Sequence, residues 1–181
     1  SVVTSLRPNN TKPFSYEAEL SRQFPELEFE RPDGEVVYRA KGLTGPIVLK
    51  RALQHFASKG ALDINTLGAK NVEALVDSGL VKDLADIYEL KVDDLLGLER
   101  FADISARKLV EAIYDKKTPP LSRFLFGLGI RHVGAQTAAD IANKFRKLDN
   151  IGTASLDDLL AINGVGNVVA DSIYLWFDED E

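Results

Sequence analysis

One stretch near the end of the chain determines how the rest of it is interpreted. It consists of Ile162-Asn163-Gly164-Val165-Gly166-Asn167-Val168-Val169-Ala170. A short helical pattern at 155–161 precedes this stretch, and a second one extends from it to residue 177. Gly164 and Gly166 allow a tight turn because glycine tolerates positive φ and projects no side chain. Val165, which lies between them, is expected to point inward and hold the turn against both helices.

The second helix of this pair begins with unpaired amide N–H groups at the positive end of its dipole, which favours phosphate binding. The pattern resembles the helix-hairpin-helix motif, which binds the DNA backbone without reading its sequence. A plain turn between two helices, with no ligand, would have the same pattern. One occurrence does not separate these two interpretations.

Composition excludes several classes of protein. Of the 181 residues, 45% are hydrophobic, which supports a packed core of one sizeable domain or two small ones. The chain has no cysteine and only two histidines, His55 and His132, which excludes disulfides and disfavours a histidine-based zinc site. No apolar run approaches the roughly 18 residues of a membrane span, and no signal peptide is evident. We therefore expect a cytoplasmic protein without membrane association.

The net charge of −6 is unevenly distributed along the chain. Residues 1–60 hold 9 basic and 7 acidic residues, whereas 61–181 hold 13 basic and 21 acidic. Within 116–147, however, Asp140 is the single acid among seven basic residues, a window that favours a phosphate-facing surface. A solvated helix face without function is the alternative. The basic residues are Lys116, Lys117, Arg123, Arg131, Lys144, Arg146 and Lys147.

The chain changes character at about residue 60. Residues 1–13 combine a β-prone start with a polar, proline-containing linker, and 26–30 and 35–40 alternate around Arg31-Pro32-Asp33-Gly34 as a β-hairpin does. A helix is expected from Pro46 to about Ser58, and from 61 onward every patterned segment indicates helix. The sequence predicts a mainly α fold: a small β-hairpin module followed by a compact all-α domain of four helix-hairpin-helix motifs.

Four turns of similar composition, at 64–68, 100–105, 130–134 and 162–166, support this prediction. Their spacing of about 30 residues indicates an internal repeat of a helix-turn-helix unit. One such unit cannot bury its own apolar face, so the four are expected to pack into one compact body.

The four turns differ in the residues that could contact phosphate. The fourth keeps both glycines, and the first and third keep the second one, with Thr66 and His132 at the earlier glycine position. The second turn has neither glycine, and from Lys82 to Asp103 there are three basic and seven acidic residues. We therefore expect the second turn to be structural. The candidate DNA-binding residues are Gly68, Lys70, Arg131, His132, Gly134, Gln136, Thr137, Gly164, Gly166 and Asn167.

Several longer stretches resemble the C-terminal region of bacterial NAD-dependent DNA ligases. They are Arg7-Pro8-Asn9, His55-Phe56-Ala57-Ser58, Ala61-Leu62-Asp63-Ile64, Leu96-Gly97-Leu98-Glu99-Arg100-Phe101 and Leu125-Phe126-Gly127-Leu128-Gly129-Ile130-Arg131-His132-Val133-Gly134. The resemblance implies that 1–13 end an OB-fold, 14–60 form a zinc-finger-like hairpin plus helix, 61–177 form the four-motif helix-hairpin-helix domain, and 178–181 are an acidic tail. In that family the hairpins grip minor-groove phosphates around a nick, while separate domains perform the chemistry.

The zinc-finger-like segment departs from the family's pattern of four cysteines. The corresponding positions fall on Ala18, Ser21, Ala40 and Gly45, so no structural zinc is expected there. Without the metal, residues 14–30 either form a metal-free apolar cluster or are partly disordered. The cluster would contain Phe14, Tyr16, Leu20, Phe24, Leu27 and Phe29.

The chain also lacks the family's Lys-x-Asp-Gly adenylation motif. Lys91-Val92-Asp93-Asp94 has no glycine and is better interpreted as the start of a helix. We therefore expect no catalytic residue and no cofactor in this chain, with NAD binding left to the missing adenylation domain. The implied partners are double-stranded or nicked DNA, in replication and repair, and the missing adenylation and OB domains.

Two alternatives remain. Helix-hairpin-helix repeats also serve as protein-interaction modules, and the acidic tail with Trp176 and Phe177 could dock a partner. The repeats could also belong to another DNA repair or recombination factor, although the hairpin-plus-helix layout of 14–56 matches the ligase arrangement better.

Overall fold

The computed structural model describes residues 28–30, 39–41 and 45–178, which fall in two compact units. In the first unit, which ends at Gly45, β1 (Glu28–Glu30) pairs antiparallel with β2 (Arg39–Lys41), and Phe29 lies opposite Ala40. The segments predicted at 1–13 and around the hairpin turn, and most of the zinc-finger-like segment, lie outside the described residues.

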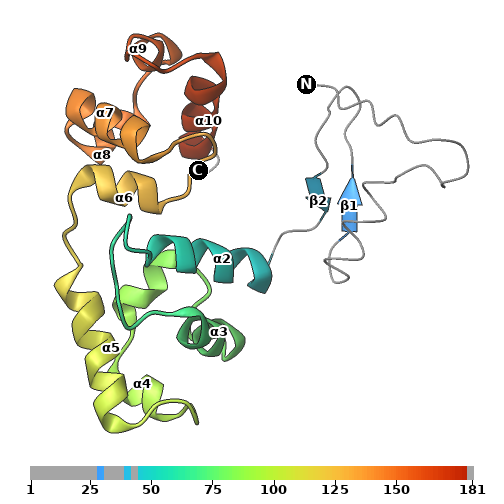
Figure 1. Cartoon of the computed structure of the whole chain (residues 1–181), viewed down its shortest axis with the longest axis vertical. Coiled ribbons are helices and arrows are strands. Elements are labelled where there is room, and N and C mark those ends of the chain that lie inside the picture. The colour runs from blue at the N-terminus through green and yellow to red at the C-terminus, as the bar shows by residue number, and fades with distance from the viewer. Residues whose placement is uncertain (1–27, 31–38, 42–44, 179–181) are drawn as a thin grey trace, which may run out of the picture. The chain divides into compact units, whose positions relative to one another are not determined.

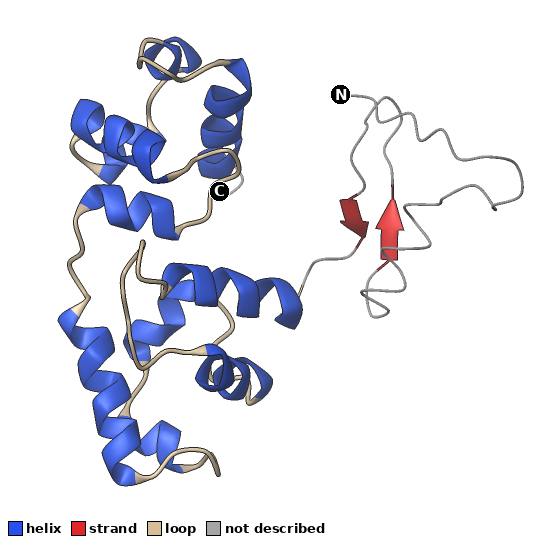
Figure 2. Ribbon diagram, in the orientation of Figure 1, coloured by secondary structure: helices blue, strands red, loops and turns tan. Residues whose placement is uncertain are grey.

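The second unit begins at Pro46 and consists of helices and connecting turns over its described residues (Figures 1 and 2). The mainly α fold is therefore confirmed for this unit. None of the helices in this described part is both long and apolar enough to cross a bilayer. The helices are α2 (Pro46–Phe56), α3 (Ala69–Asp77), the 3-10 helix η1 (Leu84–Glu89), α4 (Val92–Leu96), α5 (Asp103–Asp115), α6 (Leu121–Gly127), α7 (Ala135–Phe145), α8 (Leu148–Gly152), α9 (Leu156–Leu160) and α10 (Asn167–Asp178).

Local sequence accounts for the starts of two of these helices. The Asp83 carboxylate accepts a bond from the Ala85 amide at the start of η1, and Ser155 Oγ accepts one from the Asp158 amide at the start of α9. Both are side-chain caps of helix N-termini. The sequence did not predict α8. Arg146 ends α7 in the left-handed conformation, with φ 63°, and the chain then resumes a helix at Leu148.

The unit contains two hydrophobic cores rather than one. The first is built from residues between Leu53 and Ile113, and the second from residues between Leu125 and Ile173. Each core includes two of the four turns. The sequence predicted a single packed body, and the structure shows that the repeats bury their apolar faces in pairs within one compact unit.

The two cores meet where α2 packs against α6 (Figure 1). His55 Nε2 lies 2.7 Å from the carbonyl oxygen of Phe126, and Arg123 Nη1 donates to the carbonyl oxygen of Ala61 at 3.1 Å. A Cβ atom on Gly127 would lie 3.2 Å from atoms of the Phe56 and Leu62 side chains, so the two helices approach closely. Helix α2, which the sequence analysis grouped with residues 14–60, therefore packs within the helical unit.

Candidate nucleic-acid interface

Four turns connect successive helices with the same hydrogen bond. We call them turn 1 (64–68), turn 2 (98–102), turn 3 (130–134) and turn 4 (162–166). In each, the amide of the fourth residue donates to the carbonyl oxygen of the first, at 3.0 Å in turn 1 and 3.1 Å in the others. Turn 2 begins earlier than the predicted 100–105, because α5 starts at Asp103. The four starting positions, 64, 98, 130 and 162, confirm a repeat of slightly more than 30 residues.

The fourth residue of each turn is buried in its core. Leu67 is 3% exposed, Phe101 6%, Val133 8% and Val165 7%. These apolar side chains hold the turns against their helices, as the sequence predicted for Val165. The residues beside them are left at the surface.

Glycine occupies the fifth position of turns 1, 3 and 4, although the fold does not require it there. Gly68 and Gly134 have ordinary extended conformations, with φ −80° and −85°. A Cβ atom at Gly68, Gly134 or Gly166 would meet nothing within 4 Å. A glycine that neither the backbone nor the internal packing demands leaves room for a group outside the protein to approach the main chain.

The helices that follow turns 1 and 3 have free N-termini. Gly68 and Gly134 are the residues that precede α3 and α7, and neither helix has a side-chain cap. Their first amide groups are available to an outside acceptor, at the positive end of the helix dipole. Such an arrangement suits an oxyanion such as phosphate.

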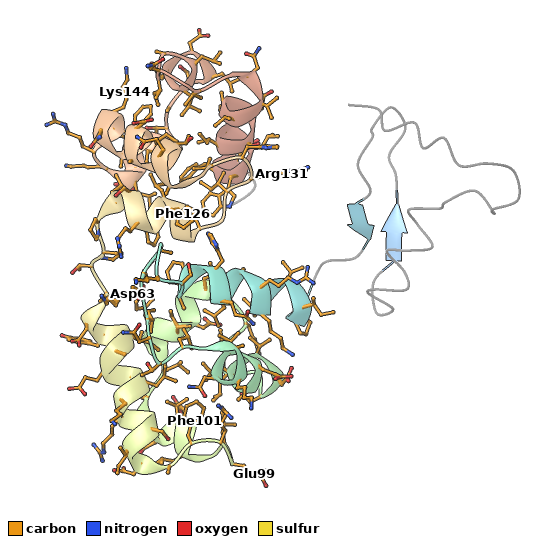
Figure 3. All side chains as sticks on the ribbon, viewed as in Figure 1. Asp63, Glu99, Phe101, Phe126, Arg131 and Lys144 are labelled. Atoms are coloured by element: carbon orange, nitrogen blue, oxygen red, sulfur yellow. The ribbon has the colours of Figure 1, made fainter. Side chains whose placement is uncertain are left out.

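Turn 2 differs at its fifth position and in the charges around it. Ala102 stands at the fifth position, and its amide donates to Ser105 Oγ at 2.9 Å. The Asp103 carboxylate binds Arg107 Nε at 3.0 Å, and this hydrogen bond raises the pKa of the Arg107 guanidinium. Glu99 is exposed at the tip of the turn (Figure 3). The two carboxylates and the occupied amide disfavour a phosphate at turn 2.

The structure distributes the ten candidate residues over turns 1, 3 and 4. In turn 1 and the start of α3, Gly68 and Lys70 are exposed. In turn 4, Gly164 has φ 85°, and Gly166 and Asn167 are exposed at the start of α10.

Turn 3 holds the other five candidates. Arg131, His132 and Gly134 are exposed, and His132 takes the left-handed conformation with φ 67°. Gln136 Nε2 donates to Asp140 Oδ1 at 3.0 Å, so this amide is engaged within α7. Thr137 is half-buried.

The basic window at 116–147 does not form one surface. Arg123 contacts the carbonyl oxygen of Ala61 at the junction of the two cores. In the view of Figure 3, Lys144 lies at the left and Arg131 at the right of the part of the unit that is built around the second core. Basic residues that are close in sequence are therefore not all close in space, because Arg123 lies in α6, Arg131 in turn 3 and Lys144 in α7.

Two residues near the turns have a role that the sequence did not predict. Asn71, in the first turn of α3, donates from Nδ2 to the Thr66 carbonyl oxygen at 2.7 Å. Its Oδ1 accepts a bond of 2.6 Å from Arg100 Nε of turn 2. No local pattern predicts this link, because Asn71 and Arg100 are 29 residues apart.

The positions expected to lack zinc ligands are only partly described. Ala40 lies in β2 and Gly45 precedes α2, and neither side chain offers a donor atom. Ala18 and Ser21 lie outside the described residues. Over the part of the chain that the structure describes, no three His, Asp or Glu side chains gather as a metal site would need.

Comparison with known proteins agrees with the division of the helical unit into two halves, one around each hydrophobic core. Residues 59–115 match the model of a SAM-like helix-hairpin-helix tandem, and 123–181 match that of a helix-hairpin-helix motif. A DNA ligase from Trichlorobacter lovleyi is 48% identical over 149 residues, which are 82% of this chain and 22% of that ligase. The chain is homologous to part of a DNA ligase. Turns 1 to 4 are thus helix-hairpin-helix turns, and the chain spans less than a quarter of that relative.

Proposed function

We propose that the helical unit binds the sugar–phosphate backbone of duplex DNA through turns 1, 3 and 4. The observation that carries the proposal is the exposed glycine at the fifth position of each, in open space and ahead of a helix N-terminus. Main-chain amides at such a position can donate to phosphate oxygens only if no side chain keeps the phosphate away. Contacts of this kind position a protein on DNA and carry no sequence information.

Exposed polar side chains beside the glycines would add to these contacts. Lys70 follows Gly68, Arg131 lies in turn 3, and Asn167 follows Gly166. With so few cations at the turns, we expect weak binding by the isolated chain and a modest salt dependence. The logarithm of the association constant falls by about 0.9 per neutralised phosphate for each unit of log salt.

The homology to a DNA ligase gives this binding a biological setting. We propose that the chain is the non-catalytic C-terminal part of a bacterial, cytoplasmic, NAD-dependent ligase, and that it holds nicked DNA during replication and repair. The adenylation and OB domains of the larger protein would bind NAD and seal the nick. In this proposal the segment before residue 45 is a metal-free counterpart of a zinc finger. The 48% identity to a ligase favours this setting over another repair factor.

Fluorescence-anisotropy titration of intact and nicked duplexes, at two salt concentrations, tests the proposal. Gly68→Val, Gly134→Val and Gly166→Val should each weaken binding, by roughly tenfold or about 1.4 kcal/mol, because the new side chain meets the phosphate rather than the protein. Circular dichroism should show unchanged folding.

Turn 2 provides the matched control. Ala102 has the same extended position ahead of a helix, with φ −101°, and is exposed. Ala102→Val should therefore leave the affinity unchanged. Equal affinities for the wild type and all four variants would refute backbone binding by these turns. A zinc assay on the same preparation checks the metal-free segment.

A protein-interaction module is the second candidate, and exposed apolar side chains favour it. Val168 and Leu175 of α10 are 61% and 54% exposed, and Leu156 and Leu160 of α9 are exposed as well. Stable self-association in sedimentation experiments, with no salt-sensitive DNA binding, would favour this function over the first.

A further inference from the structure

We propose that Arg100 and Asn71 are positioning residues, through which turn 2 holds turn 1 in its DNA-binding conformation. The inference rests on the proposed function and assigns a role to turn 2, which has no phosphate site of its own. We call the Arg100–Asn71–Thr66 hydrogen-bonded chain the clasp.

The clasp connects three elements. Asn71 lies in the first turn of α3, and its Nδ2 donates to the Thr66 carbonyl oxygen at 2.7 Å. Arg100 Nε, from turn 2, donates to Asn71 Oδ1 at 2.6 Å. Both ends of the Asn71 amide are therefore engaged, which fixes its orientation. The Arg100 bond is charge-assisted, so it is stronger than an ordinary amide bond.

Turn 1 needs such support because its third residue differs from those of turns 3 and 4. His132 and Gly164 occupy that position in the left-handed conformation, with φ 67° and 85°. Thr66 does not, and as a β-branched residue it strongly disfavours that region. Turn 1 thus reaches the same hydrogen-bonded closure with a different backbone at its centre. The Asn71 bond to the Thr66 carbonyl oxygen stabilises this alternative backbone.

Among the described residues built around the second core, no equivalent clasp forms. Gly164 of turn 4 stands where turn 2 has Arg100, and Thr137 of α7 stands where α3 has Asn71. Glycine has no side chain that could donate to the Thr137 position. The clasp therefore belongs to the half in which one turn carries the exposed glycine and the other turn carries carboxylates.

The clasp spans Gly68 and Lys70, two candidate DNA-binding residues that lie between Thr66 and Asn71 in sequence. By fixing the backbone at Thr66 and Asn71, it would fix the direction in which these two exposed residues present their main-chain groups to DNA. Without it, turn 1 would sample other backbone conformations and present its amides to phosphate for only part of the time. DNA affinity would then fall although no phosphate contact had been removed.

Two substitutions at Arg100 separate positioning from direct charge. Arg100→Gln places an amide nitrogen where Nε stands and removes the charge. Arg100→Lys keeps the charge but places a methylene there and moves the donor one bond further out. Arg100 is exposed, so both variants should fold.

We expect the full 181-residue chain to show a specific order of affinities for nicked duplex. Arg100→Gln should bind within about twofold of the wild type, whereas Arg100→Lys and Asn71→Ala should each bind roughly fivefold more weakly. The Arg100→Lys/Asn71→Ala double variant should be no weaker than Asn71→Ala, because the two residues act through one connection. The salt dependence should be the same for the wild type and all four variants, since no phosphate contact is lost.

Other results overturn the clasp. Retained binding by Arg100→Lys with loss in Arg100→Gln would make Arg100 a direct phosphate contact instead. Wild-type affinity in Asn71→Ala would show that the clasp does not affect binding, while the Gly134→Val and Gly166→Val variants still report on the proposed function. If the wild-type chain binds no duplex at low salt, the proposed function fails and the clasp fails with it.

Discussion

Glycine serves two different purposes in turns 1, 3 and 4. Gly164 takes a left-handed backbone that most residues disfavour, so the turn itself needs it. Gly68, Gly134 and Gly166 face open space, and at Gly68 and Gly134 the backbone is one that any residue can adopt. The fold alone does not account for glycine at these positions. In the proposed function, a bound phosphate needs the space that a side chain would fill at these positions. Valine there should therefore weaken DNA binding and leave folding unchanged.

Thr66 leads to a prediction about stability at the same scale. Its Oγ1 is buried, and among the described residues it has no hydrogen-bond partner. Such a hydroxyl costs free energy because it has lost water without replacing it. Thr66→Val should therefore leave the free energy of unfolding unchanged or raise it by up to about 1 kcal/mol, as measured by urea denaturation.

Thr153 is the control for this substitution. Its Oγ1 donates to the Asp149 carbonyl oxygen at 3.0 Å, so Thr153→Val removes a bond that is formed and should lower stability by about 0.5 kcal/mol or more. A larger loss in Thr66→Val than in Thr153→Val would contradict the assignment of Thr66 Oγ1 as unsatisfied.

The short helix α9 depends on its cap. Helix α9, at Leu156–Leu160, is too short to be stable alone, and Ser155 and Asp158 form reciprocal bonds at its start. Leu159, which is fully buried, fixes the helix to the second core. Together the cap and this one anchor orient the chain as it enters turn 4.

Removing the cap should reduce stability in a pH-dependent way. The hydrogen bonds that Ser155 donates from its side chain and backbone lower the pKa of the Asp158 carboxyl. A carboxyl with a lowered folded pKa contributes stability above its unfolded pKa, roughly 3.9, and loses it as pH falls through the folded value. Asp158→Asn should therefore be less stable than the wild type at pH 7, and the difference should shrink during acid titration below about pH 4.

Two further variants sharpen this experiment. Ser155→Ala removes the other half of the cap and should cost about 1 kcal/mol at pH 7. Asp157→Asn, at the neighbouring exposed position, is the control for a general charge effect. A pH-independent difference between the wild type and Asp158→Asn would contradict the capping role.

The whole helical unit is two paired-turn halves joined at α2 and α6. The junction combines the His55 and Arg123 bonds to main-chain oxygens with close packing around Gly127. Because the halves share this junction, the spatial relation of turns 1 and 2 to turns 3 and 4 depends on it. A DNA duplex held by both halves would require that relation to be kept.

Gly127→Ala tests the junction. The new Cβ would lie 3.2 Å from the Phe56 and Leu62 side chains and 3.3 Å from Ala61 Cβ. Overpacking costs about 1–3 kcal/mol, which exceeds the gain of up to about 1 kcal/mol from alanine in a helix. We expect a net loss of about 1 kcal/mol, or roughly 2–4 °C in Tm, by thermal unfolding. Gly97→Ala, with helical dihedral angles and only an ordinary contact to Asp94, should not lower Tm.

Much of the fold could be predicted because its signals are local. The apolar and glycine positions of turn 4, and the caps at Asp83 and Ser155, involve residues within a few positions of one another. These interactions recur wherever the pattern does, so three of the turns and the helices around them, though not α8, were located correctly. Turn 2 was misplaced by two residues because it lacks the glycines that mark the others. The candidate site followed for turns 1, 3 and 4 by the same reasoning, and its DNA contacts stay a prediction.

The sequence by itself therefore determined the repeated unit, its mainly helical character and the glycines that stand at its surface. Tertiary structure alone decided which repeats share a core, that α2 joins the helical unit, and which side chains meet across the turns. His55 and Phe126 are 71 residues apart, and Asn71 and Arg100 are 29 apart. The reason is physical. The apolar face of an amphipathic helix favours burial, but the hydrophobic effect is non-directional, so the sequence pattern does not specify the partner. Only packing in the folded structure selects it.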